Sequence, residues 1–96
     1  MQQLPKLDSL LHNQLRLAIM SILIAVKEAD FSYLQKATKS TNGNLSVQLS
    51  KLKEAAYITI EKSFHNNYPK TTCSITAVGH AAFERYVQDI KKYLNQ

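Results

Sequence analysis

The chain has 96 residues and a formal net charge of +5 at pH 7, because 12 Lys and Arg residues outnumber 7 Asp and Glu residues. A chain of this length forms one domain with one hydrophobic core, which excludes a second core of similar size. The positive charge favours a polyanionic partner. Cys73 is the single cysteine, which excludes an intramolecular disulfide and predicts a reducing compartment, the cytoplasm.

The most apolar stretch of the sequence covers residues 17–26 and is interrupted by Ser21. It falls well short of the roughly 20 residues that a membrane span needs, so it predicts a core helix and no membrane partner. The N-terminal residues also lack the charged and apolar regions of a signal peptide.

A first helix is predicted over residues 8–28, because Asp8 and Ser9 are good N-caps and neither Gly nor Pro follows them in this range. Its apolar residues lie on more than one side. One stripe contains Leu11, Leu15, Ile19, Ile22 and Val26, and a second contains Leu10, Leu17 and Ile24. Since a surface helix normally buries one stripe, the second stripe predicts contact with another subunit.

Two shorter helices are predicted next. A connection at residues 29–31 leads to a helix over residues 32–39, where Ser32 and Gln35 have capping-box spacing. After a turn at residues 40–43, a third helix over residues 43–55 carries Leu45, Leu49 and Leu52 at i, i+4 and i+7 as its buried stripe. Short helices joined in this way, the second with a polar outward face, predict a helix-turn-helix.

Residues 57–76 predict a β-hairpin. Apolar and polar residues alternate over residues 57–64 and again over residues 71–76, where Cys73 and Ile75 are the apolar positions and Cys73 is expected to be a half-buried structural residue. The connection at residues 65–70 is polar and cationic. These features predict a wing that lies along the DNA backbone or reaches into a minor groove.

A final helix is predicted over residues 77–94, with Thr76 as its N-cap. Its apolar and aromatic residues form a seam at near-heptad spacing, and so small a domain leaves little surface for them to pack against. A homodimer is therefore predicted, with an interface formed by Leu10, Leu17, Phe83, Tyr86, Val87, Ile90, Tyr93 and Leu94.

The outward face of the third helix and the wing contain the candidate DNA-binding residues. Short polar or cationic side chains suit a close approach to phosphates and base edges, and an exposed valine suits a thymine methyl group. Lys39, at the end of the second helix, suits a phosphate contact, and Lys36 on the same helix supports it. The candidates are Lys39, Thr41, Asn44, Ser46, Val47, Gln48, Ser50, Lys51, Lys62, His65, Asn66, Asn67 and Lys70.

Other kinds of site have little support in the sequence. His12, His65 and His80 are far apart and have no partner at metal-ligand spacing, so no metal or other cofactor is expected. The chain has neither a Gly-rich phosphate loop nor a nucleophile elbow, which excludes the enzyme classes that need them and predicts a protein without catalytic residues. His12 and Arg16 lie one turn apart and are expected to face solvent or a carboxylate.

The order helix, helix, helix, strand, strand, helix resembles the small winged-helix transcriptional regulators related to MarR and ArsR. The residues that carry the resemblance are Arg16, Phe31, Gly43, Asn44, Leu45, Ser46, Leu49, Leu52, Tyr57, Lys62, Phe64, Pro69, Thr72, Thr76, Gly79 and Phe83. The resemblance implies a mainly α winged helix with a small β-hairpin. It also implies a dimeric, repressor-like regulator whose third helices enter successive major grooves of a palindromic site in double-stranded DNA.

Two residues depart from the pattern of that family. Ala56 stands where Gly is common before the first wing strand, and it disfavours a left-handed C-cap, which only Gly adopts freely. Gln48 stands where many members have His, and its amide is able to read adenine.

Two alternative interpretations remain open from the sequence. The first is a winged-helix protein-interaction module that does not bind DNA, with the third and last helices docked on another protein. The second adds a small-molecule effector, of unknown identity, in a cleft between the first and last helices, where Tyr86 and Tyr93 would line the pocket.

Overall fold

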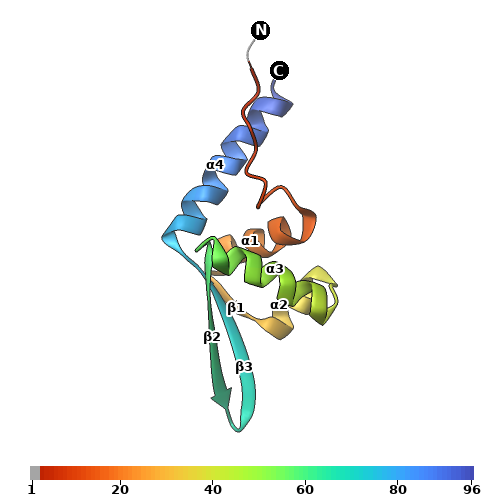
Figure 1. Cartoon of the computed structure of the whole chain (residues 1–96), viewed down its shortest axis with the longest axis vertical. Coiled ribbons are helices and arrows are strands. Elements are labelled where there is room, and N and C mark those ends of the chain that lie inside the picture. The colour runs from red at the N-terminus through yellow and green to blue at the C-terminus, as the bar shows by residue number, and fades with distance from the viewer. Residues whose placement is uncertain (1–2) are drawn as a thin grey trace.

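A computed structural model describes residues 3–96 as four helices and a three-stranded antiparallel sheet (Figure 1). The sheet has the order β1-β3-β2, so β3 lies in the middle. The mainly α winged-helix fold predicted from the sequence is confirmed. The elements are α1 (Gln14–Val26), β1 (Glu28–Asp30), α2 (Phe31–Thr38), α3 (Asn42–Glu54), β2 (Ile58–His65), β3 (Tyr68–Ile75) and α4 (Ala77–Leu94).

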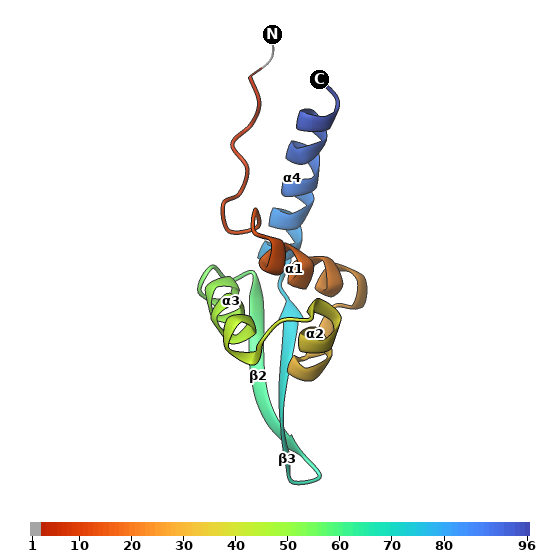
Figure 2. The ribbon, with the colours of Figure 1, turned by 90° about the vertical axis from the view of Figure 1, so that its right-hand side faces the viewer.

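The molecule is elongated, with principal extents of 59 × 25 × 21 Å. Helices α1, α2 and α3 form the body, and the β2–β3 hairpin projects from it at one end (Figure 2). Helix α4 projects at the opposite end, where the N-terminal segment, from residue 3, runs beside it (Figures 1 and 2). Among the described residues, no helix is both long and apolar enough to cross a membrane.

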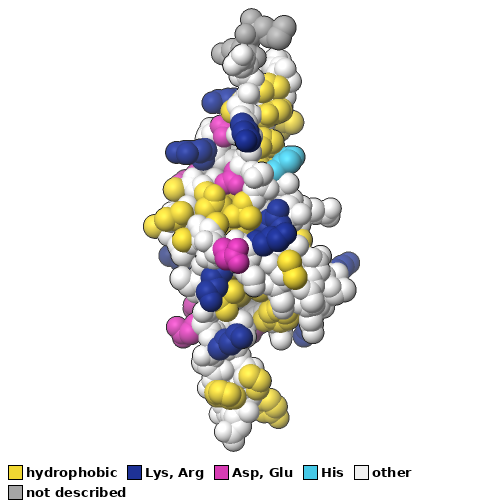
Figure 3. All heavy atoms as spheres, viewed as in Figure 1, with side chains coloured by type: hydrophobic (Ala, Val, Ile, Leu, Met, Phe, Trp, Pro, Cys, Tyr) yellow, Lys and Arg dark blue, Asp and Glu magenta, His cyan; other side chains and the backbone are white. Residues whose placement is uncertain are grey.

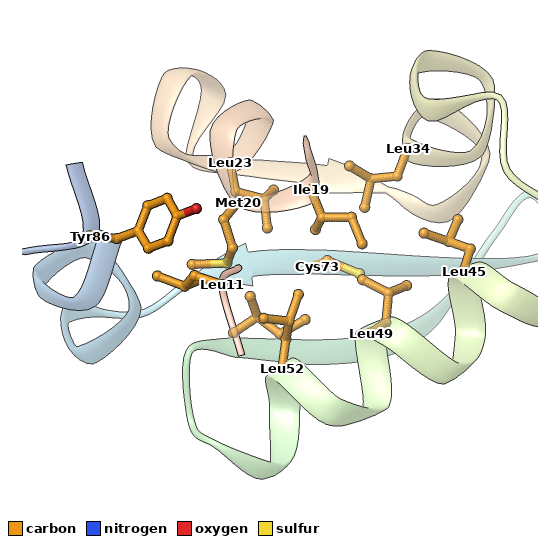
Figure 4. Packing of buried hydrophobic residues seen from close by; sticks show 11 residues of the cluster. Leu11, Ile19, Met20, Leu23, Leu34, Leu45, Leu49, Leu52, Cys73 and Tyr86 are labelled. Atoms are coloured by element: carbon orange, nitrogen blue, oxygen red, sulfur yellow. The ribbon is translucent and has the colours of Figure 1, made fainter. Parts of the chain in front are cut away.

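The hydrophobic core lies between the helices and one face of the sheet (Figure 4). The three leucines of α3 point towards β3, where Cys73 is fully buried. Burial, with a smaller effect of the Asp30 charge, raises the pKa of the Cys73 thiol to about 11, so the thiol is protonated and inert at neutral pH. The core contains Leu11, Ile19, Met20, Leu23, Leu34, Leu45, Leu49, Leu52, Ile58, Cys73 and Tyr86.

The start of the first helix differs from the prediction of residue 8. The Asp8 carboxylate accepts hydrogen bonds from the backbone N–H groups of Leu10 (2.9 Å) and Leu11 (3.3 Å), and so caps a single turn that does not continue. The Asn13 side chain then accepts the N–H of Arg16 at 3.0 Å and caps α1. Two capping residues five positions apart thus divide the predicted helix, and Leu11 enters the core from the turn.

The end of the first helix also differs from the prediction of residue 28. Lys27 has a φ of 73°, which ends α1, and the residues that follow pair with β3 in the register Glu28↔Ser74 and Asp30↔Thr72. The predicted connection at residues 29–31 is therefore mostly strand. Ser32 is not the cap of the next helix, because the Asp30 side chain accepts the Tyr33 N–H at 2.7 Å and α2 begins at Phe31.

The wing has a tighter turn than the predicted connection over residues 65–70. Strands β2 and β3 remain paired up to His65↔Tyr68, which leaves Asn66 and Asn67 as a two-residue turn. Both residues have positive φ, 51° and 67°, as a type I′ hairpin turn requires. Asparagine adopts this region more readily than other residues with side chains, and so it permits the tight turn.

The end of α3 has the left-handed residue that Ala56 was expected to disfavour. Ala56 has a φ of 63°, its N–H bonds the Lys53 carbonyl at 2.9 Å, and the Tyr57 N–H bonds the Leu52 carbonyl at 3.0 Å. These two bonds are those of a Schellman motif. The expectation was wrong because these bonds offset the roughly 1–2 kcal/mol that a left-handed alanine costs.

Three tyrosines attach the N-terminal segment to the rest of the molecule. The Tyr57 hydroxyl donates to Asp8 Oδ2 at 2.5 Å, the Tyr86 hydroxyl shares a hydrogen bond of 2.7 Å with His12 Nδ1, and the Tyr93 hydroxyl donates to the Pro5 carbonyl at 2.5 Å. Burial and the Asp8 carboxylate raise the pKa of Tyr57 to about 12. The Tyr57 hydroxyl therefore stays protonated near neutral pH and donates to Asp8.

Helix α4 begins in close contact with the base of the wing. The Thr76 hydroxyl donates to the Ala56 carbonyl at 2.6 Å and accepts the Gly79 N–H at 2.9 Å. A Cβ atom on Gly79 would overlap the Tyr57 carbonyl oxygen, with the Tyr57 Cα only 2.9 Å away. Only glycine therefore allows α4 to start at this position.

Substitution of the two glycines by alanine should have opposite effects on stability. Gly79→Ala should lower the free energy of unfolding by about 1–3 kcal/mol, because the added methyl group meets rigid backbone. Gly43→Ala is the matched control, since its Cβ position is open and it lies within α3, and it should raise stability by about 0.5–1 kcal/mol. Urea denaturation measures both, and equal effects of the two substitutions would contradict this packing.

Candidate nucleic-acid interface

The outward face of α3 is determined by the burial of its inward face. Leu45, Leu49 and Leu52 are at most 2% exposed, which fixes the rotation of the helix about its axis. Most of the predicted DNA-binding residues of α3 are consequently exposed, and Val47 is 50% exposed. The exposed candidates are Asn44, Ser46, Val47, Ser50 and Lys51, whereas Gln48 is half-buried.

The turn before α3 is held by side chains. Lys39 ends α2 in the left-handed conformation, and the Gln35 amide donates to the Ser40 carbonyl at 2.8 Å. Thr41 is the N-cap of α3, because its hydroxyl accepts the Asn44 N–H at 3.1 Å. Two of the predicted contacts, Lys39 and Thr41, therefore lie exposed at the junction of the two helices, and the Thr41 hydroxyl also has a structural role.

A hydrogen-bonded chain connects α1 to the outward face of α3. Arg16 donates from Nε to the Leu10 carbonyl at 2.5 Å and from Nη1 to Gln48 Oε1. Gln48 Nε2 in turn donates to Asn44 Oδ1 at 3.0 Å. Arg16 was expected to face solvent or a carboxylate, and this expectation was wrong. Its partner lies 32 positions away in the sequence, which no local pattern reveals.

Gln48 keeps part of its hydrogen-bonding capacity in this chain. A side-chain amide has two N–H donors and an oxygen with two lone pairs, and Arg16 and Asn44 use one of each. One donor and one lone pair remain, which are the groups that a bidentate contact with adenine needs. Arg16 therefore restricts the orientation of the amide without removing its ability to read a base.

The predicted wing residues all lie at the surface. Every residue from 61 to 70 is exposed, including Lys62, His65 and Lys70. The turn residues Asn66 and Asn67 lie at the end of the hairpin that is farthest from the termini (Figure 1). The hairpin extends beyond α2 and α3, so its tip is free to contact a surface that the helices do not reach.

Charges are unevenly distributed over these elements. Residues 31–53 contain four lysines and no acidic residue, and residues 62–70 contain two lysines and no acidic residue. The carboxylates of Glu28, Asp30 and Glu61 line a hollow of about 410 Å³ on the sheet, which Lys70 of the wing also borders. Figure 3 shows Lys and Arg side chains over the body and the wing. Glu54 ends α3 and Glu61 lies on β2, so only residues 31–53 and 62–70 form the cationic surface that suits a polyanion.

The predicted dimer residues lie on two different faces. Tyr86 is only 5% exposed and points from α4 into the core (Figure 4), so its place in an interface is corrected to a place in the protomer core. Tyr93 faces the N-terminal segment through its bond to Pro5. Leu10 and Leu17 are half-buried against the core. The remaining four residues form one stripe of α4, at i, i+4, i+7 and i+11: Phe83 and Ile90, which also pack against the core, and Val87 and Leu94.

A second hollow lies beside α4. Asp8, Tyr57, Arg85, Tyr86 and Asp89 are among the residues that line this space of about 400 Å³ between the N-terminal segment and α4. It corresponds to the cleft that was considered for an effector, with Tyr86 in its lining but not Tyr93.

Comparison with known proteins identifies the family. A family model described as a winged helix DNA-binding domain matches residues 15–94 of this chain. The chain belongs to this family. An uncharacterized protein of Methanocaldococcus jannaschii is 33% identical over 75 residues, which cover 78% of this chain and 82% of that protein.

Solved structures show the same fold. A transcriptional regulator homologue from Pyrococcus horikoshii matches with a TM-score of 0.84 and 29% identity over 90% of this chain and 85% of that chain. A transcriptional regulator of the MarR family from Silicibacter pomeroyi matches with a TM-score of 0.67 and 15% identity, over 88% of this chain and 56% of that chain. Family and fold together point to a DNA-binding regulator rather than an enzyme.

The link between Arg16 and Gln48 should be measurable as an energetic coupling. Arg16→Met keeps the aliphatic stem but removes two hydrogen bonds from a charged group, and should lower the free energy of unfolding by about 1–2 kcal/mol. In a double-mutant cycle with Gln48→Leu, measured by urea denaturation, the coupling energy should exceed about 0.5 kcal/mol. Additivity of the two substitutions would show that the contact has no energetic weight.

Proposed function

We propose that the protein is a sequence-specific, homodimeric transcriptional regulator that places α3 in the major groove and the wing on the adjacent backbone or minor groove. The observation that carries this proposal is the outward face of α3, which is exposed and, up to Lys53, uncharged or cationic, next to a wing whose residues 62–70 contain no acidic residue. The printed description of the Pyrococcus horikoshii relative as a transcriptional regulator homologue supports it.

The residues of α3 suit distinct parts of the DNA. Val47 is half exposed and suits a thymine methyl group, while Gln48 and Asn44 have the amides that pair with adenine. Ser46, Ser50 and Lys51 are exposed beside them and suit phosphate oxygens. In this arrangement α3 determines the preferred sequence, and the lysines supply most of the affinity.

The proposed dimer uses the α4 stripe of Phe83, Val87, Ile90 and Leu94. The N-terminal segment bonds the neighbouring side of α4 through Tyr86 and Tyr93, and Leu94 in the stripe is 77% exposed. A two-fold axis through the stripes would leave both α3 helices free on the far side. Such a dimer should bind an inverted repeat with half-site centres about 10 or 20 base pairs apart.

The decisive experiment is a binding selection from a pool of random duplex DNA at moderate salt, followed by sequencing of the retained molecules. An enriched inverted repeat would support a dimeric regulator and supply its operator. Retention without enrichment would contradict sequence specificity. Failure to retain DNA would contradict the whole proposal and favour the protein-interaction module.

Charge reversal of two lysines should distinguish a DNA-binding regulator from a protein-interaction module. Lys51→Glu combined with Lys62→Glu should abolish binding to the selected duplex. One lysine lies on α3 and the other on the wing, so each new carboxylate would repel the phosphates that the proposed interface contacts. Lys6→Glu combined with Lys91→Glu is the control with the same change of net charge, and should bind almost normally since both lysines lie near the opposite end of the molecule. Fluorescence anisotropy measures both affinities.

The salt dependence of binding by the unmodified protein provides a second measurement in the same assay. With about six to eight phosphate contacts per dimer, log K should fall against log salt concentration with a slope of about −5 to −7. A flat dependence would contradict phosphate binding.

Acidic residues in the α4 stripe should dissociate the dimer. Val87→Glu combined with Leu94→Glu would place four charges at the symmetric interface without touching the protomer core, whereas Gln88→Glu adds a charge to an exposed position on the other side of α4. Sedimentation velocity should show a folded monomer for the first variant and a dimer for the second. A folded dimer from the double variant would place the interface elsewhere.

A further inference from the structure

The tip of the wing has an exposed aromatic surface that the core does not use. Phe64 is 79% exposed and Tyr68 is 75% exposed, although each is large enough to stabilise a core by burial. Pro69 lies opposite Phe64 in the strand pairing and is also exposed. Figure 3 shows hydrophobic side chains near the end of the hairpin. Grouped apolar surface at a projecting tip marks a contact site.

The groups around the aromatic residues indicate an anionic partner. Residues 62–70 contain Lys62 and Lys70 and no acidic residue, although Lys70 borders the hollow that holds Glu28, Asp30 and Glu61. The two residues of the turn, Asn66 and Asn67, present amides that both donate and accept hydrogen bonds. The tip thus combines cations, amides and apolar rings within one hairpin, a combination that suits a polyanion with flat apolar groups between its charges.

We propose that the wing tip is an apolar wedge for the minor groove of DNA, in which Phe64 and Tyr68 insert against the bases, open a base step and bend the duplex. This inference rests on the proposed function and adds a second mode of recognition to it. Proteins that insert apolar side chains into the minor groove partially unstack a base step and kink the duplex towards the major groove. Lys62 and Lys70 would hold the flanking phosphates.

The geometry of the hairpin fits this role. A two-residue turn ends the hairpin, so the tip is only two strands wide, about 5 Å between strand axes. The minor groove is about 6 Å wide, so the side chains at the tip are able to enter it while the full ribbon is not. In the strand register Phe64 pairs with Pro69, and Tyr68 pairs with His65. Adjacent pairs face opposite sides of a hairpin, so the two rings flank the tip, one on each face of the ribbon.

An anionic membrane also offers negative charges above an apolar layer, and so it is the other partner that would suit the wing tip. The position of the wing favours DNA. The hairpin belongs to the sheet on which α3 packs, and residues 31–53, which contain four lysines and no acidic residue, lie on the same body from which it projects. A flat membrane would have to meet the tip alone, whereas a duplex in contact with α3 extends past the helix towards the wing.

The test uses the duplex recovered by the binding selection, made as a set of circularly permuted fragments. We expect the unmodified protein to bend it, as seen from mobility that depends on the position of the site. Phe64→Ala combined with Tyr68→Ala should remove the bend and weaken binding about 5- to 100-fold, as base contacts of aromatic residues do. Both rings are exposed, so the variant should fold normally, which circular dichroism checks.

Two further variants sharpen the result. Val78→Ala removes an apolar side chain that is 55% exposed at the start of α4, and should change neither the bend nor the affinity. Phe64→Leu keeps an apolar wedge, and should retain most of the bend if insertion, rather than a specific aromatic contact, opens the step.

Each result separates the wedge from the proposed function. If the unmodified protein retains no DNA, the proposed function fails and the wedge fails with it. If it binds but the double alanine variant binds within about twofold and bends the duplex equally, the regulator stands and the wedge is wrong. Sedimentation with vesicles of phosphatidylserine and phosphatidylcholine tests whether the tip binds membranes. If the unmodified protein binds the vesicles, the double alanine variant does not, and both bend DNA equally, the tip is a membrane contact and the wedge is wrong.

Discussion

The packing of three leucines of α3 against the sheet determines how this protein presents its surface. Leu45, Leu49 and Leu52 point towards Cys73 on the central strand, and their burial sets the rotation of α3. A rotation of one residue, about 100°, would bury Ser50 or Lys51 and expose a leucine. The polar outward face and the cationic neighbourhood of α3 therefore depend on the same apolar contact that stabilises the fold.

Hydrogen bonds around this contact connect the N-terminal segment to both α4 and the proposed DNA-binding face of α3. Arg16 joins the Leu10 carbonyl to Gln48, and Gln48 joins Asn44. Hydrogen bonds from tyrosines hold the N-terminal segment against α4 and against the base of the wing. Polar contacts therefore join α4 to the N-terminal segment, and Arg16 joins the N-terminal segment to α3.

The proposed interface combines two kinds of affinity. Lysines of α2, α3 and the wing act through phosphates and depend on salt, whereas Val47 and the aromatic wing tip act through apolar contact and base shape. The phosphate contacts and the proposed wedge therefore have different effects that two measurements distinguish. Salt slope reports the first kind of contact, and the bend of the duplex reports the second.

The sequence by itself determined the winged-helix fold class, the buried stripe of α3 and the alternation of the hairpin, because helix and strand periodicity are local properties of the chain. Tertiary structure alone decided the separate turn before α1, the short strand β1, the left-handed Ala56 and the burial of Tyr86. A three-residue strand has no readable period, and Ala56 is held by bonds within a motif that usually needs glycine. Arg16 meets Gln48, and Tyr86 meets His12, across 32 and 74 positions. Such distant partners are brought together only when the whole core has formed, so no pattern within either segment predicts them.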